Sequence, residues 1–175
     1  MLIFDTETTG LIENMTTRFD KQPEVVEFAA IRINEKGKIL EELDQLIKPS
    51  IPITEDITKL NGIDNDMLKD KLHFVGYASA IRDMIERSSM VIAHNAAFDV
   101  DMLNLEFKKL KMTRIAWPRI ICTVEQTIHI KGYRLTLSDL HEYLFKKKFE
   151  GAHRARADVE ALARCVVELR KRGEL

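Results

Sequence analysis

The feature that most constrains this chain is its opening stretch, MLIFDTETTGL. An apolar run leads directly into Asp5, Thr6 and Glu7, and Gly10 marks a turn. This pattern predicts a buried strand, although a short helix would also fit it. Side chains alternate between the faces of a strand, so Asp5 and Glu7 are expected on one face. The two carboxylates repel each other, and either a solvated turn or a divalent cation such as Mg²⁺ would relieve that repulsion.

Composition places the chain among ordinary globular proteins and leaves its partners open. Its 175 residues fit a single domain, 1–175, and 27 basic residues nearly balance 28 acidic ones. Cys122 and Cys165 are too few for a disulfide framework or a zinc site, so we expect reduced thiols and a cytoplasmic location. The start lacks a basic segment typical of a signal peptide, and no apolar run is long enough to span a membrane.

Hydrophobic periodicity and turn residues predict a mixed α/β layer structure. A polar loop is expected at 11–23, with a hairpin turn at 34–37 and a basic loop around 146–151. Strands are expected at 25–33, 38–47, 90–93 and, as an edge strand, within 115–123. Helices are expected at 54–60, 64–70, 74–87, 96–111, 124–130, 135–145 and 157–172, with Thr54 and Asn95 as N-caps.

Two further acids stand where a regular element begins. Asp99 follows His94 at the start of a helix, and Asp158 follows His153 at the start of the last helix. Each acid can be read simply as a residue favoured by the helix dipole, and His153 as a solvated side chain.

The four acids together suggest more. In open α/β sheets the ends of elements meet at the site crevice. Four carboxylates suit two divalent ions, which activate a water and stabilise the leaving oxygen in phosphodiester hydrolysis. A histidine whose ordinary pKa is about 6.5 suits the role of proton acceptor.

Three segments, in this order, resemble the exonuclease motifs of the DnaQ-like superfamily: DTETTGL at 5–11, HNAAFD at 94–99 and HRARAD at 153–158. The His five residues before the last Asp resembles the DEDDh branch rather than the branch with Tyr. Segments 58–63 and 121–123 are also similar to bacterial members of the proofreading and repair type. The resemblance implies an RNase H-like fold, a five-stranded mixed sheet flanked by helices. It also implies 3′–5′ release of nucleoside 5′-monophosphates from DNA with Mg²⁺ or Mn²⁺.

By the family pattern each motif residue has a role. Asp5 would bridge the two metals, while Glu7 and Asp158 would hold the ion that carries the attacking water. Asp99 would serve the second ion, and His153 would be the general base on a loop able to swing onto substrate.

Substrate contacts follow from the same resemblance. The backbone from Thr6 to Thr8, next to Gly10, would meet the terminal 3′-OH, and Leu11 would wedge beneath the last bases. Asn95 and Phe98 would line the nucleotide pocket, although a helix cap and a core residue explain them equally well. Asn61 stands where many members have His. Arg154, Arg156 and Lys146–Lys148 would follow the phosphates of a single strand, or form a solvated basic face.

Three functions remain open from the sequence. The first is a 3′–5′ exonuclease acting on single-stranded 3′ ends of DNA, working alone or with a DNA polymerase. The second is a 3′–5′ exoribonuclease, because no motif reports contacts to a 2′-OH. The third is a non-catalytic nucleic-acid-binding or polymerase-associated module on the same fold. The sequence stops after the last helix, without a polymerase-docking tail, so we expect a stand-alone nuclease or a trimmed domain, monomeric or homodimeric.

Overall fold

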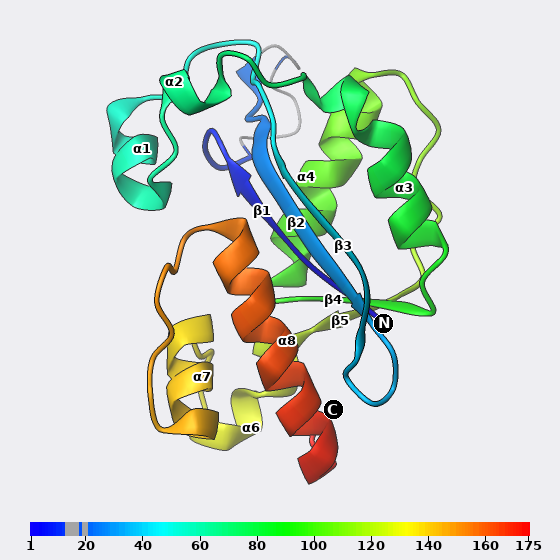
Figure 1. The fold of residues 1–175 in the computed structure, drawn as a ribbon, viewed down its shortest axis with the longest axis vertical. Coiled ribbons are helices and arrows are strands. Elements are labelled where there is room, and N and C mark those ends of the chain that lie inside the picture. The colour runs from blue at the N-terminus through cyan, green and yellow to red at the C-terminus, as the bar shows by residue number, and fades with distance from the viewer. Residues whose placement is uncertain (13–17, 19–20) are drawn as a thin grey trace.

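A computed structural model describes residues 1–12, 18 and 21–175. It contains a mixed sheet with helices on both faces (Figure 1). The expected loop at 11–23 falls largely on residues 13–17 and 19–20, which lie outside the described residues. The elements are β1 (Leu2–Thr8), β2 (Val25–Ile33), β3 (Ile39–Leu46), α1 (Glu55–Asn61), α2 (Asn65–Leu68), a 3₁₀ turn (Phe74–Gly76), α3 (Ala78–Glu86), β4 (Met90–Ala93), α4 (Ala96–Lys109), β5 (Arg119–Cys122), α5 (Thr123–Gln126), α6 (Ile128–Lys131), α7 (Leu137–Phe145) and α8 (Ala155–Arg172).

The five strands lie in the order β3-β2-β1-β4-β5. β1, β2 and β3 are antiparallel neighbours, and β4 and β5 run parallel to β1. The pairing of β1 with β4 is short, joining Leu2 to Val91 and Ile3 to Ile92. Beyond Ile3, the edge of β1 that faces away from β2 is therefore free to meet another element. The RNase H-like, five-stranded mixed sheet expected from the sequence is confirmed.

Side chains alternate between the two faces of β1 and β2 and so contribute to two hydrophobic cores. Leu2, Phe4 and Phe28 face α3 and α4 in the larger core. Ile3 and Ile31 face the apolar stripe of α8 on the opposite side. Because Asp5 and Glu7 continue the series begun by Ile3, they emerge on the α8 face, at the end of that second core.

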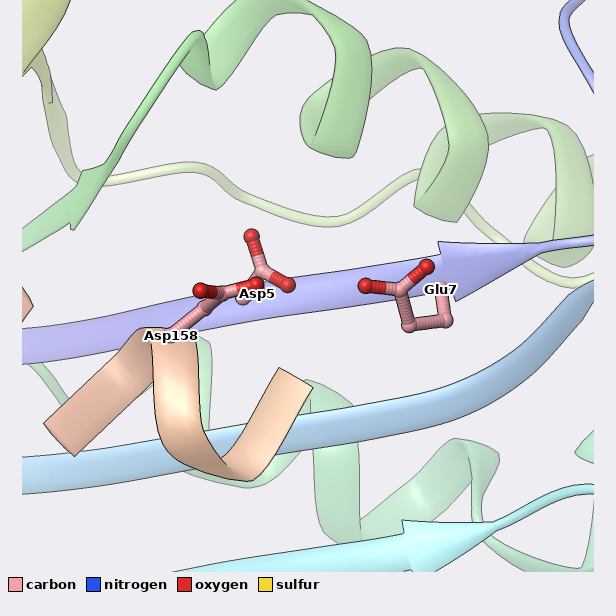
Figure 2. Close-up of side chains that lie close together, drawn as sticks. All are labelled: Asp5, Glu7 and Asp158. Atoms are coloured by element: carbon pink, nitrogen blue, oxygen red, sulfur yellow. The ribbon is translucent and has the colours of Figure 1, made fainter. Parts of the chain in front are cut away.

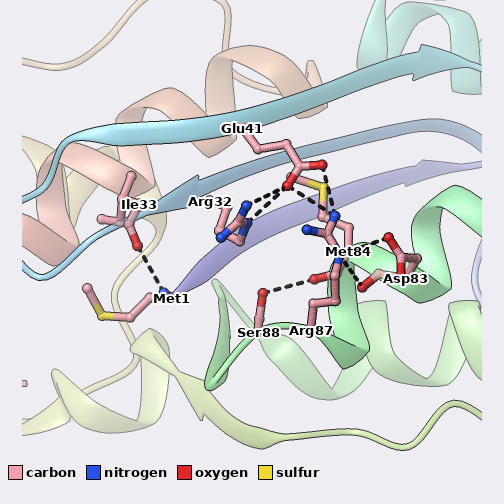
Figure 3. Close-up of polar contacts among 8 residues, drawn as sticks. All are labelled: Met1, Arg32, Ile33, Glu41, Asp83, Met84, Arg87 and Ser88. Atoms are coloured by element: carbon pink, nitrogen blue, oxygen red, sulfur yellow. Dashed lines mark hydrogen bonds and ion pairs between the residues drawn. The ribbon is translucent and has the colours of Figure 1, made fainter.

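A polar network ties β3 to α3 at the end of the sheet that carries the N-terminus (Figure 3). Glu41 on β3 accepts hydrogen bonds from Arg32 on β2 and from Arg87 at the end of α3. The amino group of Met1 donates to the carbonyl oxygen of Ile33 at 2.9 Å. These contacts hold the end of β1 that is far from its acidic residues.

Helix boundaries were the least accurate predictions. The single helix expected at 74–87 is wrong, because a 3₁₀ turn ends at Gly76 and α3 begins only at Ala78. The backbone at Gly76 passes so close to Leu72 that an added Cβ would lie 2.9 Å from the Leu72 Cδ1. The helix expected at 124–130 is also wrong: α5 and α6 are separate, and the buried Thr127 hydroxyl between them donates to the Thr123 carbonyl oxygen at 2.7 Å.

Two other helices are nearly as expected. α8 begins two residues before the predicted start, at Ala155, and α7 begins after Thr136, whose side chain caps it. Both cysteines are free. Within the described part of the chain, none of the helices is both long and apolar enough to cross a membrane.

Candidate active site

Three carboxylates from two elements converge on the α8 face of the sheet. Asp5 and Glu7 project from β1, and Asp158 projects from the first turn of α8. One carboxylate oxygen from each of the three lies within 4.8 Å of the others, and Figure 2 shows the side chains turned toward one another. An all-oxygen ligand set of this kind suits a hard cation such as Mg²⁺ or Mn²⁺. The described residues form one such group.

Asp99 reaches the site from the other side of β1. It is buried in the first turn of α4, and its Oδ1 accepts hydrogen bonds from the Thr6 backbone N–H at 3.0 Å and from the Thr6 hydroxyl at 2.7 Å. This contact uses the edge of β1 that β4 leaves unpaired beyond Ile3. Asp99 therefore lies outside the group of three, yet it is the strongest charged influence on Asp5.

The four acids are electrostatically strained without a counter-charge. Burial, together with the charges of Asp99 and Asp158, raises the pKa of Asp5 well above its usual range. Burial also raises the pKa of Glu7 to about 7 and that of Asp99 to about 7. For Asp158, burial raises the pKa to about 6, although the hydrogen bond from His153 opposes the rise. Such a cluster favours either protonation or the binding of cations.

His153 lies beside the acids on the loop before α8. Its backbone N–H donates to Asp158 Oδ2 at 3.0 Å, and its backbone adopts a left-handed conformation with φ of 67°. The residue is exposed. It is therefore not buried and bonded away from the acids, the arrangement that would argue against a role as base.

Sequence reasoning missed a fifth carboxylate in this region. Glu27 on β2 lies directly opposite Glu7 in the strand ladder and is 1% exposed. Both of its oxygens are paired with donors from Arg154 and Ala155. A signal was present, because Glu27 is the one charged residue in the apolar run VVEFAAI, and a buried charge requires a partner.

The residues expected to meet the end of a substrate differ in how exposed they are. Thr6 and Thr8 are buried, and the Thr8 hydroxyl donates to the Gly10 carbonyl oxygen at 2.7 Å. Leu11, by contrast, is 78% exposed directly after this turn, an unusual position for a large apolar side chain.

Asn61 is buried at the end of α1, and its Oδ1 accepts from the Ile63 N–H at 3.0 Å. Its Nδ2 is buried without a hydrogen-bond partner among the described residues, yet the amide counteracts part of the rise in the pKa of Glu7. The Asn61 amide therefore lies near Glu7 without forming a hydrogen bond of normal geometry. An unpaired buried donor beside the acids is a candidate for contact with a ligand.

Asn95 is the N-cap residue of α4, as predicted, but its side chain does not cap the helix. Asn95 precedes α4 in a left-handed conformation and makes no capping hydrogen bond. Its Oδ1 instead accepts from Arg134 at 3.0 Å, which turns the side chain away from the helix end. Phe98 packs partly buried against the larger core, so one side of it remains accessible.

The basic residues near His153 are mostly engaged with acids. Arg154 pairs with Glu27, and Arg156 pairs with Glu160 and with Glu42 at 2.8 Å. These contacts disfavour the idea that the two arginines follow substrate phosphates.

Comparison with known proteins agrees with this geometry. Residues 2–166 match the family described as exonuclease, RNase T. The DNA polymerase III PolC-type of Caldanaerobacter subterraneus subsp. tengcongensis is 32% identical in an alignment of 179 positions that covers 96% of this chain and 11% of that protein. The chain thus spans about a tenth of the length of such relatives.

Solved structures share the fold. Exonuclease X in complex with 5′ overhanging duplex DNA superposes with a TM-score of 0.69 at 23% identity, covering 98% of this chain and 92% of the other. The nuclease domain of 3′hExo, a DEDDh family member bound to rAMP, gives a TM-score of 0.80 at 16% identity with the same coverage of both chains. This chain therefore belongs to the exonuclease family, and it shares the fold of a DEDDh family member.

Proposed function

We propose that this chain removes nucleotides one at a time from the 3′ end of single-stranded DNA by metal-dependent hydrolysis, releasing nucleoside 5′-monophosphates. The observation that carries the proposal is the convergence of Asp5, Glu7 and Asp158, whose oxygens lie within 4.8 Å of one another. Burial raises the pKa of each acid, and repulsion from neighbouring acids, Glu27 among them, adds to the rise. A binding module gains nothing from such a cluster, because carboxylates alone repel phosphates.

The four acids would hold two divalent ions, Mg²⁺ or Mn²⁺. Asp5, Glu7 and Asp158 would bind the first ion, and Asp5 and Asp99 the second. Two such ions, when bound, activate a water and stabilise the charge on the departing oxygen. Both hydrogen bonds from Thr6 go to Oδ1 of Asp99 and fix its carboxylate. They do not use Oδ2.

His153 would act as the general base. Histidine is the side chain that most often accepts the proton of an attacking water in enzymes. The residue is exposed and its backbone is tied to Asp158, which supports a position between solvent and the acids.

The terminal nucleotide would lie between the end of β1 and the starts of α4 and α8. The backbone from Thr6 to Thr8 and Gly10 would meet the 3′-OH, and the exposed Leu11 would pack beneath the last base. The buried Nδ2 of Asn61 would donate a hydrogen bond to the substrate. Asn95 and Phe98 would border the same pocket from α4.

DNA is favoured over RNA as substrate because the relatives found in sequence are DNA polymerases. The same relationship makes association with a DNA polymerase part of the proposal. The two free thiols suit the cytoplasmic location expected from the sequence.

One experiment tests reaction, polarity and sugar preference together. DNA and RNA oligonucleotides of the same sequence, labelled at the 5′ end, are digested with Mg²⁺, with Mn²⁺ or with EDTA. We expect a ladder of products shortened from the 3′ end, faster on DNA and abolished by EDTA. Faster digestion of RNA would identify an exoribonuclease instead.

Variants connect that activity to the site. Asp5→Asn and Asp158→Ala should each abolish metal-dependent digestion while leaving the circular dichroism spectrum unchanged, since each removes a metal ligand. The control is Asp66→Asn, because Asp66 is an exposed acid on α2. Full activity in either site variant would refute the proposed centre, and loss of activity in the control would show that the effect is not specific.

A further inference from the structure

Glu27 is a buried carboxylate that the proposed reaction does not use. It lies opposite Glu7 in the ladder between β1 and β2, and its negative charge contributes to raising the pKa of Asp5, Glu7 and Asp158. A fifth acid therefore makes the cluster harder to ionise. Such a residue needs a compensating role or a strong partner.

The partners of Glu27 are all at the start of α8. Arg154 Nε donates to Glu27 Oε2 at 3.2 Å, and a terminal nitrogen of the same guanidinium donates to Oε1 at 2.9 Å. The Ala155 N–H donates to Oε2 at 2.9 Å. Arg154 is the N-cap of α8 but provides no side-chain cap of its own. Glu27 takes that place from β2, where an anion interacts favourably with a helix N-terminus.

These contacts fix the residues that directly follow His153. A non-glycine residue in the left-handed conformation is strained and persists only where its surroundings hold it. His153 adopts this conformation with φ of 67°. Asp158 holds the N–H of His153, and Glu27 holds Arg154 and Ala155, so two carboxylates fix three consecutive residues.

We propose that Glu27, paired with Arg154, is a positioning residue that fixes where His153 lies relative to the acids. The inference rests on the proposed function of His153 as general base. It assigns Arg154 to this pair and not to substrate phosphates. The two roles of Arg154 differ in their kinetic effects, because a lost phosphate contact raises KM whereas a misplaced base lowers kcat.

The kinetic test compares Glu27→Gln with the wild type in Mg²⁺. Glutamine keeps the size of the side chain and removes the charge that pairs with Arg154. Outer residues of this kind typically change activity about 10- to 100-fold, so we expect kcat to fall by that factor with KM unchanged. Glu41→Gln is the matched control. Like Glu27, Glu41 lies on a strand and pairs with arginine, but it is at the opposite end of the sheet (Figure 3). It should leave both constants unchanged.

A double-mutant cycle separates positioning from general damage. His153→Gln should itself lower kcat about 10²- to 10⁴-fold as loss of a general base. If Glu27 acts through His153, adding Glu27→Gln to that variant should lower kcat no further. If Glu27→Gln lowers kcat in the His153→Gln background as much as it does in the wild type, the inference is overturned. It is also overturned if Glu27→Gln alone raises KM without lowering kcat.

Hydrogen exchange supplies a readout that needs no activity. In metal-free protein, the amides at 152–156 should exchange faster in Glu27→Gln than in the wild type. In Glu41→Gln their exchange rates should equal those of the wild type. If Glu27→Gln does not fold, Arg154→Lys takes its place, because lysine keeps the charge but cannot form the paired hydrogen bonds. Equal exchange in all folded variants would overturn the inference. An inactive wild type with faster exchange in Glu27→Gln would instead refute the proposed function alone.

Discussion

At the scale of single residues, the central fact is a concentration of like charge that the fold does not neutralise. Asp5, Glu7, Asp99 and Asp158 all have raised pKa values, chiefly through burial. Burying acids in this way lowers the stability of the metal-free protein. Such strain is typical of functional sites, where bound ions complete the arrangement.

The first prediction concerns how the stability of the metal-free protein depends on pH. It compares the wild type with Glu7→Gln in EDTA. The pKa of Glu7 is raised from 4.5 to about 7, so protonated Glu7 is the form favoured in the folded state. The wild type should therefore lose stability relative to Glu7→Gln as pH rises from about 4.5 to about 7. Above this window the variant should be more stable by about 1–2 kcal/mol, allowing for solvent screening.

Urea unfolding at about pH 4 and at about pH 8 measures the difference. Asp66→Asn, which changes an exposed acid on α2, is the control variant. A wild type that is more stable than Glu7→Gln at the higher pH would show that the carboxylate is not strained.

The sequence was sufficient to find the acids but not their hydrogen-bond partners. The alternation of side chains along a strand predicts Asp5 and Glu7 on one face, and in the structure one carboxylate oxygen of each lies within 4.8 Å of an oxygen of Asp158. The bond from Thr6 to Asp99 could not be predicted. It depends on where β4 stops pairing with β1, which is a property of the assembled sheet.

At the scale of elements, strand and helix termini build the site. β1 extends past β4, and this leaves a free edge on which α4 places its first turn. α8 starts where Glu27 on β2 meets its first N–H groups. Propensity and capping signals found the strands and most helices. The breaks at Gly76 and Thr127 accompany local contacts, with Leu72 and with the Thr123 carbonyl oxygen, that periodicity does not report.

The β2–β3 hairpin provides a prediction about element packing. Gly37 has φ of +79°, and a Cβ there would lie 2.8 Å from Val167 Cγ2 on α8. Gly62 has a similar φ of +71° but has open space around it. Gly62→Ala should cost about 1–2 kcal/mol from backbone strain, and Gly37→Ala about 1–3 kcal/mol more from overpacking.

Denaturant unfolding of the two alanine variants compares these costs. Adding Val167→Ala to Gly37→Ala should recover part of the lost stability, because it removes the crowded methyl groups. Equal costs at both glycines would mean that the hairpin does not pack tightly on α8.

At the scale of the whole molecule, overall charge does not explain attraction to a polyanion. The formal net charge is −1, and the arginines nearest the acids are paired with carboxylates. Binding of DNA would then depend on local charge, in which bound cations reverse the sign of the acidic cluster. The same cations should also stabilise the fold.

The last prediction therefore concerns the thermal stability of the complete chain. A ligand that binds only the folded state at 100 times its Kd adds about 2.7 kcal/mol, which for a chain of this size raises Tm by about 5–11 °C. Saturating Mn²⁺ should produce such a rise in the wild type and in Asp66→Asn, and EDTA should reverse it. Asp5→Asn should show no rise, although without metal it should melt above the wild type because one strained charge is gone. Differential scanning calorimetry at neutral pH measures both effects. An equal rise with Mn²⁺ in Asp5→Asn would place the cation elsewhere on the molecule and remove the physical basis for hydrolysis at this site.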